Sequence, residues 1–145
     1  QALPGSGAWV ELESNGGLVE NNVFEANEGE GLGLWESHNV EVRGNEFRGG
    51  GVQLFFRQVC CEPRTIPHNA NIHHNRFLDW NQAAMYAFND GYKPAPGDPR
   101  SVGTKIDFNT YRRGSGPFLH WLGNEAHSLQ DMRNFWGYEL NGTLV

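Results

Sequence analysis

The sequence contains few cysteines, no long hydrophobic run and no excess of basic residues. Its only cysteines, Cys60 and Cys61, are adjacent, so no network of disulfides can hold a small core together. They form either a strained bridge to each other or two thiols. No apolar stretch approaches the roughly 20 residues of a membrane-spanning helix. Lys and Arg total 11 against 17 Asp and Glu, a net charge of −6, which predicts no nucleic-acid partner and no membrane partner.

Glycine and asparagine are abundant, and candidate helices are few. The 145 residues include 19 glycines, and both residue types tolerate the positive φ angles of sharp turns. At this length, with 38% hydrophobic residues, the chain suits one globular domain. We therefore expect a single domain of short strands joined by tight turns.

A pattern of one asparagine flanked by apolar residues occurs four times. In each copy a β-branched residue stands three positions before the asparagine, and an aromatic residue stands two positions after it. The asparagines are Asn22, Asn45, Asn75 and Asn109, the β-branched residues are Val19, Val42, Ile72 and Ile106, and the aromatic residues are Phe24, Phe47, Phe77 and Tyr111. Strand alternation turns these apolar side chains inward and the residue just before the turn outward.

A second strand is predicted after each asparagine turn, as in "GLGLWES" and "GVQLFFR". The opening "AWVELES" fits the same position, which gives about five copies. The asparagines are 23, 30 and 34 residues apart, and the added residues fall in proline-containing loops. A short period of this kind predicts a solenoid, in which each repeat buries its inner face by stacking on its neighbours.

The segments "NVEVRGNEF", "NANIHHNRF" and "TKIDFNTYRRG" resemble the coils of right-handed parallel β-helix proteins of the pectate lyase-like superfamily. The resemblance implies an all-β, right-handed parallel β-helix over residues 1–123, with the asparagines in a ladder at one turn. It also implies that residues 124–145 form the C-terminal cap and tail of the same domain. Ser128 followed by Asp131 resembles a capping box and predicts a short helix over residues 129–135.

A row of charged residues is expected on the outside of neighbouring coils. Its members stand two positions before each asparagine and are Glu20, Arg43, His73 and Asp107. Strands about 4.8 Å apart would place Asp107 beside His73, where a carboxylate orients an imidazole as a general base. The alternative is a surface ladder of ion pairs that contributes little to stability.

Glu41 offers a second arrangement of carboxylates on the same outer face. It lies diagonally from Glu20, about 8 Å away in an ideal sheet, and this spacing is within the range of inverting glycosidases. Two exposed carboxylates without a catalytic role are the alternative. The neighbouring side chains of His73 and His74 should diverge on a strand, so we expect no metal site and no cofactor.

Aromatic residues of the second strands are predicted to form an outward row of binding platforms. The row consists of Trp9, Trp35, Phe55, Tyr86 or Phe88, and Trp121. Flat rings of this kind suit the apolar faces of sugars, and Arg57 and Arg100 are placed to border the groove. The alternative is a satellite core of these rings beneath the long loops.

The resemblance and this groove together imply a polysaccharide-active protein, secreted or at the cell surface, that binds a polysaccharide or oligosaccharide. Hydrolysis would use paired carboxylates, whereas elimination would use a base and cations such as Arg43, Arg57 or Lys105. The alternative is a non-catalytic carbohydrate-binding or cell-surface scaffold, because a fold does not dictate a function.

The first coil, with Val10 and Leu12 inward, shows no cap in the sequence. An uncapped coil exposes apolar surface and unpaired strand edges. We therefore expect this coil to associate with a second copy of the chain, as a homo-oligomer, or with preceding β-helix coils.

Overall fold

The computed structural model describes residues 7–11, 14–58, 66–89 and 95–145. About half of these residues lie in short strands, and α1 (Leu129–Trp136) is the one α-helix in these ranges. The chain is therefore all-β, as expected. Its strands belong to three sheets, here called sheets A, B and C.

Each sheet collects strands that recur along the chain. In spatial order, sheet A contains β1 (Ala8–Glu11), β4 (Glu30–Trp35), β7 (Val52–Gln58), β10 (Ala83–Asn89), β13 (Leu119–Trp121) and β14 (Asn124–Ala126). Sheet B contains β11 (Lys105–Asp107), β8 (Asn71–His73), β5 (His38–Arg43) and β2 (Asn15–Glu20). Sheet C contains β15 (Thr143–Leu144), β12 (Thr110–Arg112), β9 (Arg76–Leu78), β6 (Glu46–Arg48) and β3 (Val23–Glu25).

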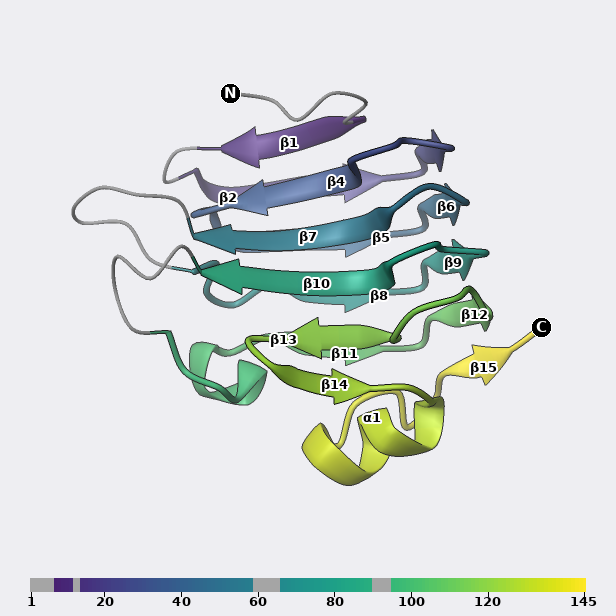
Figure 1. The fold of residues 1–145 in the computed structure, drawn as a ribbon. Coiled ribbons are helices and arrows are strands. Elements are labelled where there is room, and N and C mark those ends of the chain that lie inside the picture. Colours follow the sequence, from purple (N-terminus) through teal and green to yellow (C-terminus); the bar gives the residue numbers. More distant parts are fainter. Residues whose placement is uncertain (1–6, 12–13, 59–65, 90–94) are drawn as a thin grey trace.

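The chain passes through sheets A, B and C in turn and then starts again one layer further on (Figure 1). Neighbouring strands are parallel, and the exception is the antiparallel pair of β13 and β14. In sheet B the register aligns Val19, Val42, Ile72 and Ile106, in that order. The alignment of the four repeats that the sequence predicted is therefore confirmed.

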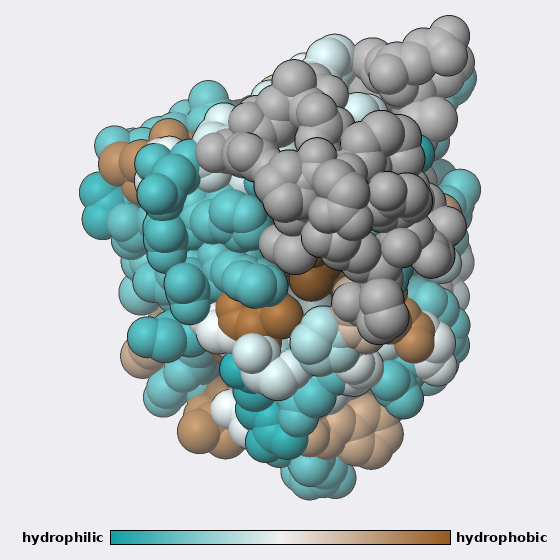
Figure 2. All heavy atoms as spheres, turned by 90° about the vertical axis from the view of Figure 1, so that its left-hand side faces the viewer, coloured by the Kyte–Doolittle hydropathy of each residue, from teal (hydrophilic) through white to brown (hydrophobic). Residues whose placement is uncertain are grey.

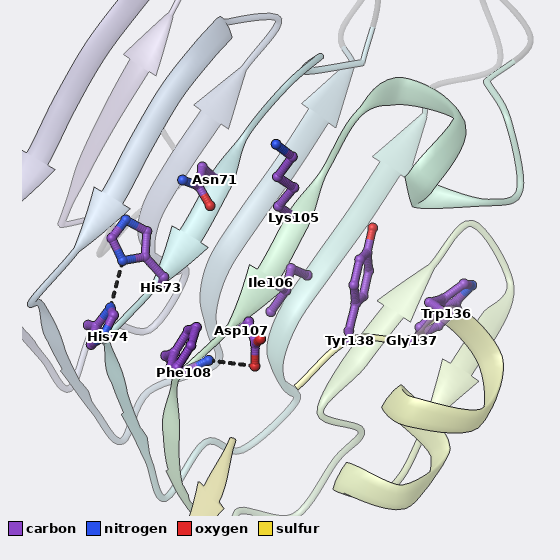
Figure 3. A pocket seen from close by; sticks show the side chains of 10 residues that line it. All are labelled: Asn71, His73, His74, Lys105, Ile106, Asp107, Phe108, Trp136, Gly137 and Tyr138. Carbon is purple, nitrogen blue, oxygen red and sulfur yellow. Dashed lines mark hydrogen bonds between the residues drawn. The ribbon is translucent and has the colours of Figure 1, made fainter. Parts of the chain in front are cut away.

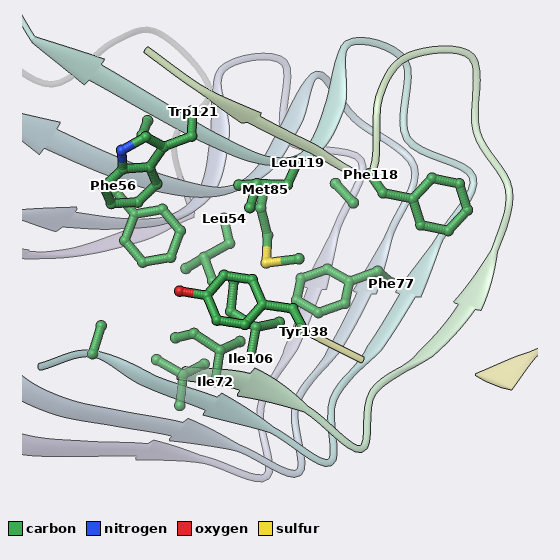
Figure 4. Packing of buried hydrophobic residues seen from close by; sticks show 14 of the residues in the cluster. Leu54, Phe56, Ile72, Phe77, Met85, Ile106, Phe118, Leu119, Trp121 and Tyr138 are labelled. Carbon is green, nitrogen blue, oxygen red and sulfur yellow. The ribbon is translucent and has the colours of Figure 1, made fainter. Parts of the chain in front are cut away.

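The interior is formed by side chains from all three sheets. Leu54 and Phe56 of sheet A, Ile72 and Ile106 of sheet B and Phe77 of sheet C belong to one buried cluster (Figure 4). The aromatic residue of each repeat also stacks on the same residue of the next repeat, with ring centroids 4.9 Å apart for the pair from β6 and β9. Identical positions thus pack on each other from layer to layer, which explains why the sequence repeats the same residue types.

The repeated asparagines form a hydrogen-bonded ladder between sheets B and C. The Oδ1 atom of Asn45, Asn75 and Asn109 each accepts from the backbone N–H and from the Nδ2 group of the asparagine one repeat earlier, at 2.9 to 3.1 Å. This arrangement gives the buried polar groups of each turn a partner. The ladder is therefore a structural feature, as the sequence analysis inferred.

Glu139 takes the acceptor position at the end of this ladder. Its Oε2 accepts from the backbone N–H of Asn109 at 3.2 Å, and its Oε1 accepts from Asn109 Nδ2 and from the Tyr111 hydroxyl, both at 2.6 Å. Burial raises the pKa of the Glu139 carboxyl, and the hydrogen bonds from Tyr111 and Asn109 offset only part of that effect.

Helix α1 begins with the predicted cap. The Ser128 hydroxyl accepts a hydrogen bond from the backbone N–H of Asp131 at 3.0 Å, while the Asp131 carboxylate accepts from the backbone N–H of His127 at 2.8 Å. The helix ends at Trp136, where Gly137 adopts the left-handed conformation of a C-terminal cap. Leu129, Met132 and Trp136 bury one side of the helix against the last layer of strands.

Figure 2 shows the side of the molecule at which strands β4, β7 and β10 end. The described residues on this side are mostly hydrophilic, and hydrophobic residues appear in separate small patches. Within the described ranges, no helix has the length and apolar character needed to cross a bilayer.

Candidate functional site

The predicted site residues lie on two different outer faces of the molecule. The charged row lies on sheet B, whereas the predicted aromatic residues lie on sheet A. Each face therefore has to be considered as a separate site.

The charged row of sheet B has the predicted register but forms a different set of contacts. Arg43 lies between Glu20 and His73 in the sheet. Its Nε donates to Glu20 Oε2 at 3.0 Å, and its Nη1 lies 3.5 Å from Glu41 Oε1. Arg43 therefore neutralises both carboxylates that were candidates for an inverting pair. This ion pairing makes the two carboxylates poorly suited to acid–base catalysis of glycoside hydrolysis.

The predicted pairing of His73 with Asp107 is wrong. His73 Nε2 bonds to Glu41 Oε1 at 2.7 Å. Asp107 Oδ1 instead accepts from the backbone N–H groups of Phe108 and Asn141, and its Oδ2 accepts from Asn141 Nδ2. Partial burial opposes ionisation of Asp107, but the hydrogen bonds from Asn141 and Phe108 outweigh it and hold its pKa below the usual range. Asp107 anchors the C-terminal segment and does not orient the imidazole.

The side chains of His73 and His74 do not diverge, contrary to the expectation for a strand. His74 has a φ angle of 54°, so the chain leaves the extended conformation at this residue. The two Nδ1 atoms consequently lie 2.7 Å apart. Glu41, His73 and His74 thus form a continuous hydrogen-bonded chain, and His74 was not among the predicted site residues.

A cavity of about 460 Å³ lies beside this chain on the outer face of sheet B. Its lining includes Asn71, His74, Lys105, Phe108 and Tyr138 (Figure 3). The volume falls within the range of small-molecule sites, about 300–1,000 Å³. The cavity is therefore large enough for a ring-sized ligand.

On sheet A the outward position of β13 is occupied by His120. The register pairs Tyr86 with His120 and pairs Trp121 with the inward residue Ala87. Trp121 is completely buried and donates from Nε1 to the backbone oxygen of Pro96 at 2.9 Å. Its prediction as an exposed binding platform is wrong, because the alternation in "LHW" turns Leu119 and Trp121 inward together.

Trp35 points outward but is not exposed. Only 4% of its surface is accessible, its Nε1 donates to Glu30 Oε1 at 3.1 Å, and the Arg57 guanidinium lies 4.7 Å from the centre of its ring. Its ring also stacks on that of Trp9. Trp35 therefore belongs to a small packed cluster outside the sheet, as the alternative of a satellite core implied, and it is not a free platform.

Glu30 is a buried carboxyl on this face that the sequence analysis missed. Burial raises its pKa, and the positive charge of Arg57 and the hydrogen bond from Trp35 offset part of this shift. Its Oε2 and the Nε of Arg57 have no hydrogen-bond partner within the described ranges. Glu30 also lines a small cavity of about 180 Å³ together with Phe55.

A partly buried stack of rings remains on the outer face of sheet A. Phe55, Tyr86 and His120 occupy the same outward position on β7, β10 and β13. Their ring centroids lie 5.5 Å apart for the first pair and 4.2 Å apart for the second, with interplanar angles of 23° and 3°. This ring stack confirms the outward direction of Phe55 and Tyr86, and it replaces Trp121 with His120.

The imidazole of His120, at the end of the ring stack, forms hydrogen bonds through its ring nitrogens. Its Nδ1 bonds to Glu125 Oε1 at 2.8 Å, and Glu125 Oε2 bonds to His127 Nε2 at 2.9 Å. The hydrogen bonds from His120 and then from His127 lower the pKa of the Glu125 carboxyl. The carboxylate of Glu125 accepts from Nδ1–H of His120, which fixes the tautomer and leaves Nε2 as the nitrogen with the lone pair. Among the described residues, this Nε2 accepts one long contact, of 3.3 Å, from the backbone N–H of Gly123.

Arg100 does not border either cavity. It forms a two-point ion pair with Asp98, the residue that caps the short 3₁₀ helix η1 (Pro99–Val102), and the hydrogen bond from Arg100 lowers the pKa of Asp98. Its predicted role in substrate binding is therefore not supported by its position. Cys60, Cys61 and Leu12 lie outside the described residues.

Across the described ranges, no group of three or more His, Cys, Asp or Glu side chains has an arrangement suited to a metal ion. Comparisons with known protein families, curated proteins and solved structures give no match. Arguments about function therefore rest on the geometry of the two faces.

Proposed function

We propose that the chain is a right-handed parallel β-helix that binds a polysaccharide along the outer face of sheet A. Three features support the β-helix assignment: the three parallel sheets visited in turn, the stacked repeats and the asparagine ladder. A polysaccharide ligand would place the protein outside the cell or at its surface.

The observation that carries this proposal is the ring stack of Phe55, Tyr86 and His120. The three rings are stacked face to face with nearly parallel planes and are partly buried, so their edges form an apolar strip that runs across three strands. The apolar faces of sugar rings pack against such surfaces, while their rims require hydrogen-bonding groups. Glu125 and Gln82 supply exposed polar groups near the two ends of the strip.

Cleavage of the bound chain is a second candidate function, favoured by the position of His120. His120 Nε2 would remove the proton on C5 of a uronate, the electrons of that C–H bond would form the C4–C5 double bond, and the glycosidic oxygen would leave with the electrons of the C4–O bond and take a proton from water. Glu125 would hold the imidazolium that forms. Arg57, on the same face, would bind the carboxylate of another sugar of the chain.

Hydrolysis fits the described carboxyl groups less well than elimination. Glu20 and Glu41 are both paired with Arg43 on sheet B. Glu30 has the raised pKa of a general acid, but its side chain is completely buried and cannot reach a glycosidic oxygen in this conformation. A general acid must lie within hydrogen-bonding distance of the atom that it protonates.

Binding is tested by titration calorimetry with polygalacturonate, alginate and a neutral β-glucan. We expect Tyr86→Ala to weaken binding to the preferred polysaccharide by about fivefold to tenfold through loss of the stacking surface. Tyr86→Phe keeps the ring and should bind almost as well as the parent. Phe135→Ala removes a more exposed ring, from α1, and serves as the control. Binding that is unaffected by Tyr86→Ala, or no binding by the parent, would rule out the proposal.

Cleavage is tested separately by the absorbance of unsaturated uronate products. Elimination predicts that the parent releases these products and that His120→Gln binds the polysaccharide but does not release them. His127→Gln, which removes the other histidine bonded to Glu125, should remain active. Binding without any product would leave the non-catalytic carbohydrate-binding function and exclude elimination.

A further inference from the structure

The lining of the cavity on sheet B includes aromatic residues from two parts of the chain, here called its two aromatic walls (Figure 3). One wall is the stacked pair of His74 and Phe108, with ring centroids 5.0 Å apart and an interplanar angle of 3°. The other wall is formed by Trp136, the last residue of α1, and Tyr138, two residues later; both side chains are mostly buried, at 6% exposed. Phe108 is 49% exposed, so its ring is available to a ligand.

Two hydrogen-bond donors of the cavity lining have no partner among the residues that the structure describes. Lys105 and Asn71 occupy paired positions on β11 and β8, and both line the cavity. Neither side chain forms a hydrogen bond or ion pair with any of the described residues. No carboxylate in the described part of the chain therefore neutralises Lys105 by direct contact.

Two carboxylates of sheet B, Asp107 on the same strand as Lys105 and Glu41 in the same row of the register, are engaged elsewhere. Asp107 accepts three hydrogen bonds, from Phe108 and Asn141. Glu41 is bound by Arg43 and by His73. Neither is free to turn toward Lys105 without giving up these contacts, so an anion from solution would be the natural partner of the ammonium group.

The hydrogen bonds of the two histidines determine what His74 offers to a ligand. An ionised Glu41 only accepts, so His73 Nε2 must carry a proton. When the pair is uncharged, His73 Nδ1 accepts from His74 Nδ1–H, and His74 Nε2 presents a lone pair. When one proton is added, His73 carries both N–H groups, His74 Nδ1 accepts, and His74 Nε2–H becomes a donor.

We propose that this cavity binds a small cyclic carboxylate, with the carboxylate on Lys105 and Asn71 and the ring between the two aromatic walls. Protonation of the histidine pair adds His74 Nε2–H as a further donor to the bound anion. The site lies on sheet B and is independent of the ring stack on sheet A, so either proposal can fail without the other.

The test uses the intact chain and two-dimensional NMR titrations with glucuronate and benzoate, and with glucose and cyclohexanol as uncharged counterparts. We expect at least one carboxylate to shift the signals of residues around Lys105 and His74, and the uncharged compounds to bind at least tenfold more weakly. Glucuronate binding alone would identify a uronic acid as the ligand, and benzoate binding alone would identify an aromatic acid. Equal binding of charged and uncharged compounds, or no binding, would overturn the proposal.

Variants separate the roles of the charge and of the ring. Lys105→Met keeps the length of the side chain without its charge and should weaken carboxylate binding at least tenfold, whereas Lys105→Arg should restore most of it. Arg113→Met removes an exposed cation that does not line the cavity and is the matched control. Phe108→Ala should weaken binding of both carboxylates and uncharged rings. Unchanged binding by Lys105→Met would contradict the assignment of the anion to this residue.

A further variant tests the role of the histidine pair. His74→Phe keeps an aromatic ring beside Phe108 but removes both ring nitrogens. We expect it to weaken carboxylate binding severalfold and to leave the weak binding of the uncharged compounds unchanged. Equal carboxylate binding by His74→Phe and the parent would exclude His74 as a donor.

Discussion

Replacement of Asn75 by alanine removes five side-chain hydrogen bonds from the interior of the ladder. Asn75 Oδ1 accepts from the backbone N–H and from Nδ2 of Asn45, and Asn75 Nδ2 donates to the backbone oxygens of Val42 and His73 and to Asn109 Oδ1. Asn75 is 1% exposed, so water cannot replace these bonds without opening the layer.

The cost follows from the groups that lose their partners. The buried backbone N–H of Asn45 loses its acceptor, and the oxygen of Val42 loses a donor. A buried polar group without a partner costs about 1–3 kcal/mol, so Asn75→Ala should lower the free energy of unfolding by about 2–6 kcal/mol. The same substitution at Asn22 is the internal control, because Asn22 is exposed and donates only to Glu20 and Asn45. Its cost should be under about 1 kcal/mol.

Urea unfolding followed by circular dichroism measures both variants against the parent. The expected result is a midpoint that falls strongly for Asn75→Ala and scarcely for Asn22→Ala, with the parent's slope retained. Similar losses in the two variants would show that burial does not set the energy of the ladder. A small loss in both would show that the asparagines matter for turn conformation and not for satisfying buried groups.

Two further predictions concern buried side chains. The pKa of Glu139 is raised in the folded state, so its contribution to stability is full below its pKa in the unfolded chain, about 4.5, and is lost as the pH rises through its pKa in the folded chain. In urea unfolding, the parent should therefore lose stability relative to Glu139→Gln as the pH increases over that range. A difference between the two proteins that stays constant with pH would contradict the assignment. Trp121→Ala should lower the free energy of unfolding by about 3–5 kcal/mol in the same assay, because the Trp121 side chain is fully buried. Phe135 is half-exposed on α1, so Phe135→Ala should lower it by less than about 1 kcal/mol. Equal losses in the two variants would place Trp121 at the surface.

The layered arrangement was predictable because the same residue types recur in the same order. Val42 and Ile72 align in sheet B, and Phe47 and Phe77 align in sheet C, as the spacing around the asparagines required. Strand alternation then specifies which side chains point inward. Such predictions need only the register, and the register is repeated along the sequence.

The contacts of the outer residues depend on more than register. Arg43 binds Glu20 on the neighbouring strand β2 and Glu41 two residues earlier on its own strand β5, because its long flexible side chain can turn toward either carboxylate. Asp107 turns away from His73 because the C-terminal segment offers it the N–H groups of Asn141. That segment lies outside the repeats, so no pattern within them could reveal its contact with Asp107.

The position of Glu30 shows how comparison of the repeats can reveal more than charge spacing. Glu30 aligns with Val52, which in turn aligns with Ala83, so a carboxyl occupies a position that is apolar in the next two layers. A buried carboxyl is expensive unless it is protonated or paired, and Glu30 has a raised pKa, a hydrogen bond from Trp35 and the charge of Arg57 beside it. In a repeat protein the residue that breaks the pattern is held by its own local contacts, because the layers above and below do not require it. On the outer face of sheet A, Glu30, Arg57 and His120 each depart from the apolar or aromatic pattern of their position. For this reason the proposed function occupies this face.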